Sequence, residues 1–376
     1  MRNKKSRKVA VLEALSRGFT QRTFDAGYMD DPESRKAYGE YFGTVGFEKG
    51  AAISREIRNR NLLAFEGKKR LSMVDLGTGT GEFVRGLSEG FLPENAAGID
   101  LLCVDRSMAV LQDFSDLWNP SGPIRLRLLP ALLPETKELL KEVEGGIDLL
   151  SMANLLAENE ARLPEFRELL ATLFTRLSPG GMMVLVEPAD KRSSRSLLSL
   201  GDDLMILFPD LRVDAPCPND RRGPCPALDD PGDWCHEDRP MAFSSALTRT
   251  AASLGHVKDS LKMTYLLLSR REGRVEGDSR PTLRLVSPLH KEKGLSWGLF
   301  CDGRSLIRLR LLNRNRDRDT KSFGRLRRGD TLIDPRIGEN LPASPEGPFV
   351  EWPAGRPVVG VRRPDGAPWN AQTEEG

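Results

Sequence analysis

Three cysteines fall within nineteen residues of a segment that has little apolar material to pack. Cys217, Cys225 and Cys235 lie in APCPNDRRGPCPALDDPGDWCHEDRP, residues 215–240. Thiolates bind zinc and iron–sulfur clusters, and a bound metal can fold a loop that has no core of its own. Prolines flank the first two thiols and stiffen the backbone, which lowers the entropy lost when a site closes. The segment is therefore a candidate metal site.

The spacing of these thiols leaves the bound group open. Seven and nine residues separate them, and zinc, an iron–sulfur cluster and unliganded thiols are all compatible with that spacing. His236 or Cys301 could supply a fourth ligand. Cys103 falls in a predicted strand and is expected to be a small core residue.

A glycine-rich loop forms a second candidate site. VDLGTGTGEF, residues 74–83, follows a predicted strand and precedes a predicted helix, which is the context of a nucleotide-binding loop. Glycines let such a backbone turn tightly and approach a ligand closely. Asp105 falls twenty-four residues past Gly81, at the end of the next predicted strand. A carboxylate there can accept hydrogen bonds from both hydroxyls of a ribose.

Asp75, before the first glycine, separates this loop from a dinucleotide fingerprint. A carboxylate at that position would repel a pyrophosphate but could hold the ammonium group of a methionine moiety. The pattern resembles the S-adenosylmethionine loop of seven-strand methyltransferases; a nicotinamide-type fold and a ligand-free relic are the alternatives. The expected cofactor-binding residues are Asp75, Gly77, Thr78, Gly79, Gly81, Asp105, Arg106 and Asn154.

No motif identifies the catalytic residues. In such folds the fourth strand normally delivers the residues that meet the methyl acceptor. Here it reads DLLSMANLLAEN, with no Asn-Pro-Pro-Tyr and no Pro-Cys pair after it. Asn154 and Glu187, at two strand ends, are the catalytic candidates, and a capping or turn role explains them equally well.

Alternating strand and helix patterns should position these residues. Strand patterns at 71–77, 98–107, 124–130, 145–156 and 182–188 alternate with helical ones, which predicts a parallel, doubly wound α/β sheet. We therefore expect a class I methyltransferase-like Rossmann fold with a small C-terminal β domain. The expected parts are a helical N-terminal segment (1–66), the Rossmann domain (67–272) with a cysteine-rich insertion (214–240), a small basic β domain (273–340) and an extended Pro/Gly-rich tail (341–376).

Positive charge gathers in residues 304–328, which contain ten Lys or Arg against two Asp, although the chain's net charge is only +2. Arginines alternate with apolar residues in SLIRLRLL, so one face of that strand should be cationic. Such a concentration favours contact with a phosphate backbone, and a solvated face is the alternative. RNKKSRK at the N-terminus could add a basic arm. The expected RNA-binding residues are Arg308, Arg310, Arg314, Arg316, Arg325, Arg327 and Arg328.

Composition sets the class and compartment. Apolar residues make up 39% and charged residues 29%, which is typical of a soluble protein, and the apolar runs are too short to span a bilayer. No apolar segment follows the basic N-terminus, which argues against a secretory signal. We expect a cytoplasmic protein in a bacterium, or a mitochondrial matrix protein in a eukaryote, with reduced thiols and no membrane partner.

The order of these features resembles a methyltransferase-like family associated with the small ribosomal subunit in mitochondria and bacteria. The likeness covers about residues 35–330. It is carried by RKAYGEYFGTVGFEKGAAISREI, VDLGTGTGEF, LVEPADKRSSRSLLSL, the cysteine segment and LFCDGRSL. The resemblance implies a four-iron, four-sulfur cluster, with zinc as the alternative, on Cys217, Cys225, Cys235 and Cys301. Longer gaps between the first three cysteines depart from the family pattern.

The same resemblance implies a function and a partner. It points to an S-adenosylmethionine-dependent methyltransferase that acts on the small ribosomal subunit or its rRNA and is monomeric off the ribosome. The alternative is a non-catalytic assembly factor that binds rRNA. An acceptor-site motif would decide between them, and the sequence contains none.

Overall fold

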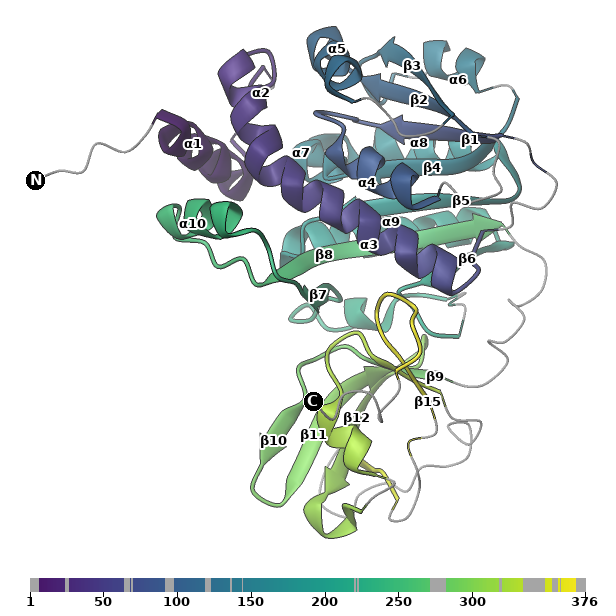
Figure 1. Ribbon diagram of the computed structural model, residues 1–376. Coiled ribbons are helices and arrows are strands. Elements are labelled where there is room, and N and C mark those ends of the chain that lie inside the picture. Colours follow the sequence, from purple (N-terminus) through teal and green to yellow (C-terminus); the bar gives the residue numbers. More distant parts are fainter. Residues whose placement is uncertain are drawn as a thin grey trace, which may run out of the picture. The chain divides into compact units, whose positions relative to one another are not determined.

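The computed structural model of the chain (Figure 1) describes residues 7–23, 27–63, 68, 70–91, 98–118, 123–135, 137–143, 145–219, 221, 223–270, 282–317, 320–333, 349–353, 358 and 360–369. It divides into two compact units. The first comprises Met1–Arg55, Ala64–Pro188 and Pro240–Met263, and the second comprises Glu56–Leu63, Ala189–Arg239 and Thr264–Gly376. No helix in the described part of the chain has the length and apolarity needed to cross a bilayer.

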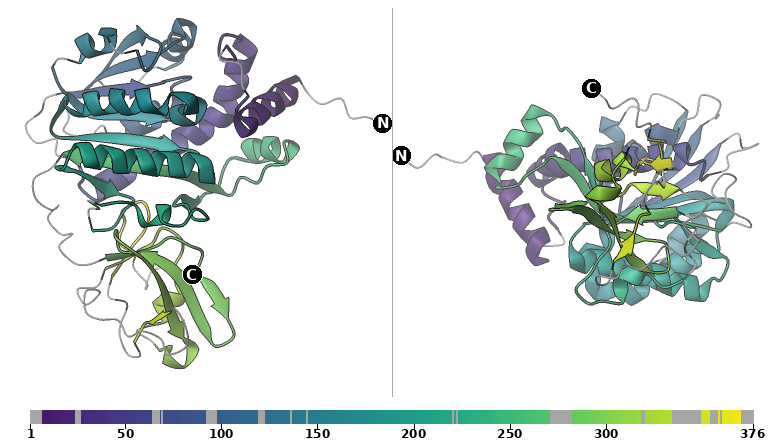
Figure 2. Two further views of the ribbon diagram at one scale, coloured as in Figure 1. Left: turned by 180° about the vertical axis from the view of Figure 1, so that it is seen from behind. Right: turned by 90° about the horizontal axis from the view of Figure 1, so that it is seen from below.

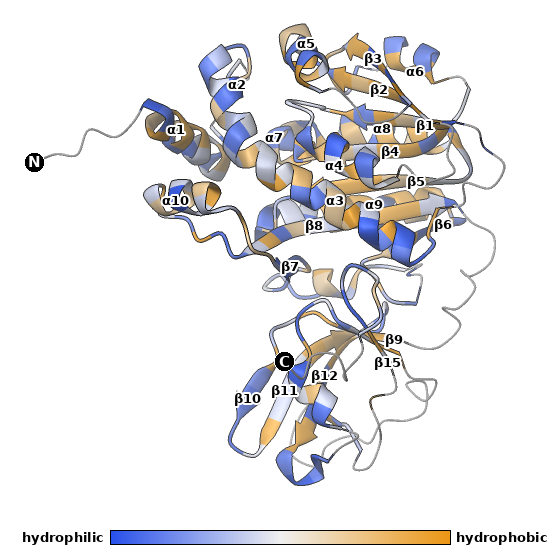
Figure 3. Cartoon of the chain, viewed as in Figure 1, coloured by the Kyte–Doolittle hydropathy of each residue, from blue (hydrophilic) through white to orange (hydrophobic). Residues whose placement is uncertain are grey.

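Parallel strands form the sheet of the first unit, in the order β3-β2-β1-β4-β5. The inner strands are nearly continuous apolar runs, visible in Figure 3, because helices cover both faces of such a sheet. The strands are β1 (Leu71–Leu76), β2 (Ile99–Asp105), β3 (Ile124–Pro130), β4 (Ile147–Ala153) and β5 (Leu177–Glu187). The expected parallel, doubly wound sheet is confirmed.

Helices lie on both faces of this sheet, with α3 (Thr44–Asn59) and α4 (Glu82–Phe91) on one face and α8 (Leu163–Phe174) on the other (Figures 1 and 2). The helix before β5 ends at Phe174, and the sequence Pro179-Gly180-Gly181 already belongs to β5. The helices that follow the strands are α4 (Glu82–Phe91), α5 (Met108–Leu117), α6 (Lys137–Glu142), α7 (Leu155–Glu158) and α8 (Leu163–Phe174), with α10 (Ser245–Ser253) later in the chain.

The N-terminal segment is helical, as predicted. It comprises α1 (Arg7–Gln21), α2 (Pro32–Tyr38), the π-helical turn η1 (Gly39–Gly43) and α3 (Thr44–Asn59). Its apolar residues pack against α10 and against the start of the next strand, β8 (Ser260–Arg270). The cluster comprises Leu12, Ala37, Tyr41, Val45, Ala52, Leu247, Ala251 and Leu261.

Two glycines let α3 and α4 approach each other to backbone contact. A Cβ on Gly50 would lie 2.2 Å from the carbonyl oxygen of Phe83, and a Cβ on Gly86 would lie 2.1 Å from that of Phe47. Any side chain would therefore push the helices apart. The contact between α3 and α4 holds the N-terminal segment against α4, the helix that follows the glycine loop.

The second unit begins with a helix and an antiparallel strand pair. Helix α9 (Lys191–Leu207) precedes β6 (Leu211–Ala215), which pairs antiparallel with β8 (Ser260–Arg270). Strand β7 (Glu237–Pro240) also pairs with β8. The cysteine segment runs between β6 and β7.

A second sheet, with strand order β14-β12-β11-β9-β13-β15 and β10 paired to β11, completes the second unit. Its core is Leu283, Leu285, Phe300, Leu309, Leu311, Phe323, Leu326, Leu332, Trp352 and Val361. The strands are β9 (Thr282–Leu285), β10 (His290–Glu292), β11 (Leu295–Cys301), β12 (Leu306–Leu312), β13 (Thr331–Ile333), β14 (Val350–Glu351) and β15 (Gly360–Arg362).

The expected β domain is present, but its boundary differs from the prediction. Strands β14 and β15 come from the segment 341–376 that was expected to be an extended tail. Trp352, between them, is only 1% exposed. The described part of this segment therefore belongs to the β domain, because its apolar residues complete the core.

Candidate functional site

The glycine loop between β1 and α4 adopts backbone angles that side chains rarely tolerate. Gly77, Gly79 and Gly81 have φ of +68°, +53° and +81°. A Cβ on Gly81 would lie 2.1 Å from Cδ2 of Phe114, and a Cβ on Gly77 would lie 2.9 Å from Cδ1 of Leu155. The loop conformation therefore requires glycine on both conformational and steric grounds.

Asp105, at the end of β2, binds this loop. One carboxylate oxygen accepts a hydrogen bond from the Gly79 N–H at 2.9 Å, and the other accepts from the Ser107 N–H at 3.0 Å. The two segments expected to hold the cofactor are thus joined to each other. Each carboxylate oxygen retains a second lone pair, so Asp105 can still accept hydrogen bonds from ribose hydroxyls.

Asp75, at the end of β1, is 3% exposed. Its Oδ1 accepts a hydrogen bond from the Ser151 hydroxyl at 2.5 Å. Burial raises the pKa of Asp75 to about 7, because a charged carboxylate is poorly solvated there. A cation placed beside it would favour the ionised form, so the site suits an ammonium group.

A cavity of about 180 Å³ in the first unit brings these residues together. Its lining includes every residue that the sequence predicted for the cofactor: Asp75, Gly77, Thr78, Gly79, Gly81, Asp105, Arg106 and Asn154. The side chain of Asn154 does not cap α7, and its φ of +57° turns the chain sharply after β4.

Aromatic side chains from the N-terminal segment line the same cavity, and sequence reasoning missed them. The rings of Tyr38 and Phe42 lie 5.4 Å apart, and those of Tyr28 and Tyr38 lie 6.2 Å apart. The Tyr28 hydroxyl donates to Glu158 at 3.3 Å, and burial raises the pKa of this carboxyl to about 7. Tyr38 and Phe42 are four residues apart, which suits one face of a helix, but nothing in the sequence shows which cavity they line.

Glu187, a predicted catalytic candidate, has a structural role. Its carboxylate oxygens accept hydrogen bonds from the N–H groups of Leu156 at 2.8 Å and Ala157 at 3.1 Å, at the start of α7. The side chain is 1% exposed and burial raises its pKa to about 8. It is absent from the residues that line the cavity. Glu187 therefore caps α7 and does not line this cavity.

The four predicted metal ligands meet in a second cavity, of about 300 Å³, which lies within the second unit. Cys217, Cys225, Cys235 and Cys301 all line it. Cys103, by contrast, is fully buried in β2, as expected of a core residue. Within the described ranges, no three His, Cys, Asp or Glu side chains form a group that could hold a metal ion.

Polar side chains hold the cysteine segment in place. Arg195, on α9, donates to the carbonyl oxygens of Ala227, Leu228, Asp230 and Asp233. The Asn219 amide donates to the carbonyl oxygens of Thr282 at 3.0 Å and Asp302 at 2.7 Å, beside Cys301. The low apolar content of the segment gives no sign of these polar contacts.

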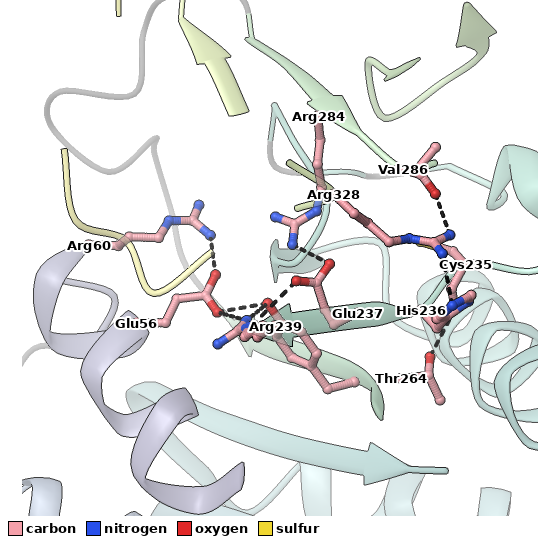
Figure 4. A network of polar contacts seen from close by, with 11 residues as sticks. Glu56, Arg60, Cys235, His236, Glu237, Arg239, Thr264, Arg284, Val286 and Arg328 are labelled. Carbon is pink, nitrogen blue, oxygen red and sulfur yellow. Dashed lines mark hydrogen bonds and ion pairs between the residues drawn. The ribbon is translucent and has the colours of Figure 1, made fainter. Parts of the chain in front are cut away.

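A buried charge network lies beside the cysteine cavity (Figure 4). Glu237 accepts hydrogen bonds from Arg284 at 2.5 Å and Arg239 at 3.4 Å. Arg239 also donates to Glu56 and to the Tyr265 hydroxyl, both at 2.7 Å. Burial acts to raise the pKa of Glu237, but Arg284 and Arg239 outweigh it and hold the pKa below its usual value. The network is therefore ionised at neutral pH.

The basic stretch does not present all its arginines to solvent. Arg310 is 4% exposed and donates to Glu351 at 2.6 Å, so its prediction as an RNA contact is wrong. Arg328 is half-buried, donates to the Val286 carbonyl and lines the cysteine cavity, so it is a poor RNA contact too. The remaining predicted RNA contacts are exposed: Arg308, Arg314, Arg316, Arg325 and Arg327.

Comparison with known proteins supports the assignment of the first unit. Residues 51–222 match the model of a family described as a methyltransferase domain. The plantazolicin methyltransferase BpumL in complex with SAH aligns at 14% identity over 70% of this chain and 100% of its own, with a TM-score of 0.39. An rRNA methylase from Streptococcus thermophilus aligns at 10% identity over 58% of this chain and 94% of its own, with a TM-score of 0.32.

Structural likenesses with TM-scores this low say nothing about activity or substrate. No curated protein sequence gives a significant match to the chain. The strand order of the first unit and the matched domain together identify a class I methyltransferase fold, to which a β-rich C-terminal region is added.

We predict that Asp105→Ala weakens S-adenosylmethionine binding about tenfold to a hundredfold, because hydrogen bonds to a charged acceptor contribute roughly 1.5–3 kcal/mol. Isothermal titration calorimetry measures the change. Asp100→Ala is the matched control, since Asp100 lies in the same strand but pairs with Arg70. Equal affinity in Asp105→Ala and the wild type would remove Asp105 from the site.

Asp75 should make this binding depend on pH. Because a bound ammonium lowers the raised pKa of Asp75, binding releases a proton at low pH. Affinity should therefore rise with pH up to about 7 and level off above it. Calorimetry across this range should show a flat profile for Asp75→Asn. Glu158→Gln should keep the slope; if it alone abolishes the slope, Glu158 and not Asp75 is the titrating group.

Proposed function

We propose that the chain is an S-adenosylmethionine-dependent methyltransferase-like protein that acts on the small ribosomal subunit or its rRNA. The observation that carries this proposal is the convergence of all eight predicted cofactor residues on one cavity of a methyltransferase domain. Asp75 suits the ammonium group of the cofactor and Asp105 suits its ribose. Aromatic rings and the Glu158 carboxyl line the same cavity, where they could meet a planar acceptor.

The proposal includes a four-iron, four-sulfur cluster on Cys217, Cys225, Cys235 and Cys301. Four thiols around a single cavity suit a cluster, which takes one thiolate per ligand position. Zinc remains the alternative. It would need its ligands much closer together, because each sulfur must lie about 2.3 Å from one ion. The bound cluster would supply a crosslink between the cysteine segment and β11, and an electron-accepting centre.

The partner is proposed from charge. Five predicted contacts among the exposed arginines of residues 304–328 form the expected phosphate-binding surface on the β domain. Because the chain as a whole is nearly neutral, the concentration of positive charge on this one surface favours a nucleic-acid partner. We place the protein in the cytoplasm of a bacterium or in the mitochondrial matrix, where its thiols stay reduced.

A non-catalytic assembly factor is the second candidate. The capping role of Glu187 favours it, because this leaves only Asn154 of the two predicted catalytic residues in the cavity. In that case cofactor and cluster would stabilise or regulate an rRNA-binding protein.

Methyl transfer separates the two candidates. Small subunits from cells that lack the protein are incubated with it and with S-adenosylmethionine labelled in its methyl group. We expect label in the rRNA with the wild type and a large decrease with Asp105→Ala. Tight cofactor binding without any label in rRNA would favour the assembly factor.

We predict that Cys301→Ser loses iron and loosens the β domain, because the binding free energy of a metal site is part of the folding free energy. Iron, sulfide and visible absorption are measured on protein purified without oxygen. Cys103→Ser is the matched control and should keep its iron, since Cys103 lies in the first unit. One equivalent of zinc and no iron in the wild type would contradict the proposed cluster. Full iron content in Cys301→Ser would show that another residue supplies the fourth ligand, and His236 would be the first residue to test.

Neutralising Arg308, Arg314, Arg316 and Arg325 should weaken binding to any RNA. The slope of log affinity against log salt concentration should fall by roughly 0.7–0.9 for each phosphate that is no longer neutralised. Filter binding over a series of salt concentrations measures this slope. Arg310→Gln should instead lower stability by about 1–3 kcal/mol, because it leaves Glu351 without its partner. A wild-type salt slope in the quadruple variant would show that these arginines form a solvated face.

A further inference from the structure

Three arginines line the cysteine cavity, and the proposed function so far uses none of them. Arg221 lies in the cysteine segment, and Arg328 is the last residue of the basic stretch of the β domain. Arg221 is only 2% exposed. Long cationic side chains are seldom buried without a partner for their charge and for their N–H groups. The contacts of these two guanidinium groups therefore show what else they could bind.

Arg221 uses only some of its N–H donors within the described part of the chain. Its Nη1 donates to Asp202 at 2.5 Å and to the Gly223 carbonyl at 2.6 Å. Its Nε and Nη2 are buried and have no hydrogen-bond partner in the part of the chain that is described. Burial lowers the pKa of Arg221, but Cys217, Cys225 and Asp202 together raise it above its usual value. Arg221 lines the same cavity as Cys217 and Cys225, so its unused donors belong to the lining of that cavity.

Arg328 lies beside the third thiol of the segment. Its Nη1 donates to Nε2 of His236 at 2.8 Å, and Nη2 donates to the Val286 carbonyl (Figure 4). Neither acceptor carries a negative charge. Its Nε is buried and has no partner among the described residues. Arg328 and Cys235 line the same cavity. By contrast, Arg284, which also lines the cavity, is already paired with Glu237.

We propose that Arg221 and Arg328 are positioning residues for the cluster, donating N–H groups toward its sulfur ligands and balancing its negative charge. This inference rests on the proposed function, because it takes the four cysteines to hold a cluster. Four thiolates outweigh the positive charge of the iron–sulfur core. One-electron reduction adds a further negative charge to the cluster. The positive charge of a nearby guanidinium and its N–H donors to the sulfurs both stabilise the reduced form more than the oxidised form, so both raise the reduction potential.

The test compares Arg328→Gln and Arg221→Lys with the wild type, all purified without oxygen. Arg221→Lys keeps a charge that can pair with Asp202 but removes the guanidinium fork, and Arg328→Gln removes a charge. Iron and sulfide are counted, and the midpoint potential is measured by titration with dithionite in the presence of mediators. We expect both variants to contain iron and to titrate at more negative potentials than the wild type. Bleaching of the visible absorption in air should also be faster.

Arg270→Gln is the matched control. It removes an exposed charge, paired with Asp210, from the same unit and should leave the midpoint unchanged. Wild-type protein without iron would refute the proposed cluster itself. Iron-loaded Arg221→Lys and Arg328→Gln at the wild-type midpoint would refute the role of the arginines and leave the cluster standing. If circular dichroism shows that Arg328→Gln does not fold, the midpoint of Arg221→Lys decides.

Discussion

The second unit depends on the burial of Glu237, a carboxylate that only adjacent guanidinium groups make tolerable in the interior. Its partners are Arg239 on β7 and Arg284 on β9, and Arg239 continues the contacts to Glu56. Removing one partner of such a pair typically costs ~3–5 kcal/mol, because the other charge is left uncompensated. Glu237 follows Cys235 by two residues, so the network also fixes the end of the cysteine segment. The ion pairs of Glu237 and the hydrogen bonds from Arg195 therefore both fix the segment that lines the cysteine cavity.

The first unit relies on close backbone approach instead. Gly50 and Gly86 bring α3 and α4 together, and the glycine loop that opens α4 is bonded to Asp105. Because α3 continues from the segment that carries Tyr38, the same crossing sets where the aromatic residues lie in the cofactor cavity. The close approach of α3 and α4 therefore fixes the positions of the glycine loop and of the aromatic residues in the cofactor cavity.

Local patterns in the sequence predicted the strand–helix alternation, the glycine loop and the grouping of its residues, since each rests on spacing along the chain. Tertiary context was invisible to those patterns. Alternation in SLIRLRLL indicated two faces, but not that Glu351 and Phe349 would cover Arg310. Proline and glycine content predicted a tail after residue 340, although Trp352 there completes a core. Glu187 at a strand end matched a catalytic position and a cap equally well, and its capping hydrogen bonds depend on where the α7 N–H groups lie, which the sequence does not show.

Native mass spectrometry of the intact chain, purified without oxygen and incubated with S-adenosylmethionine, shows whether the protein has two separate sites. We expect a single species whose mass exceeds that of the chain by one four-iron, four-sulfur cluster and one S-adenosylmethionine. Cys301→Ser should lack the first increment and Asp105→Ala the second, each without the other. A bare chain, a zinc adduct, or absence of both increments in either variant would contradict this expectation.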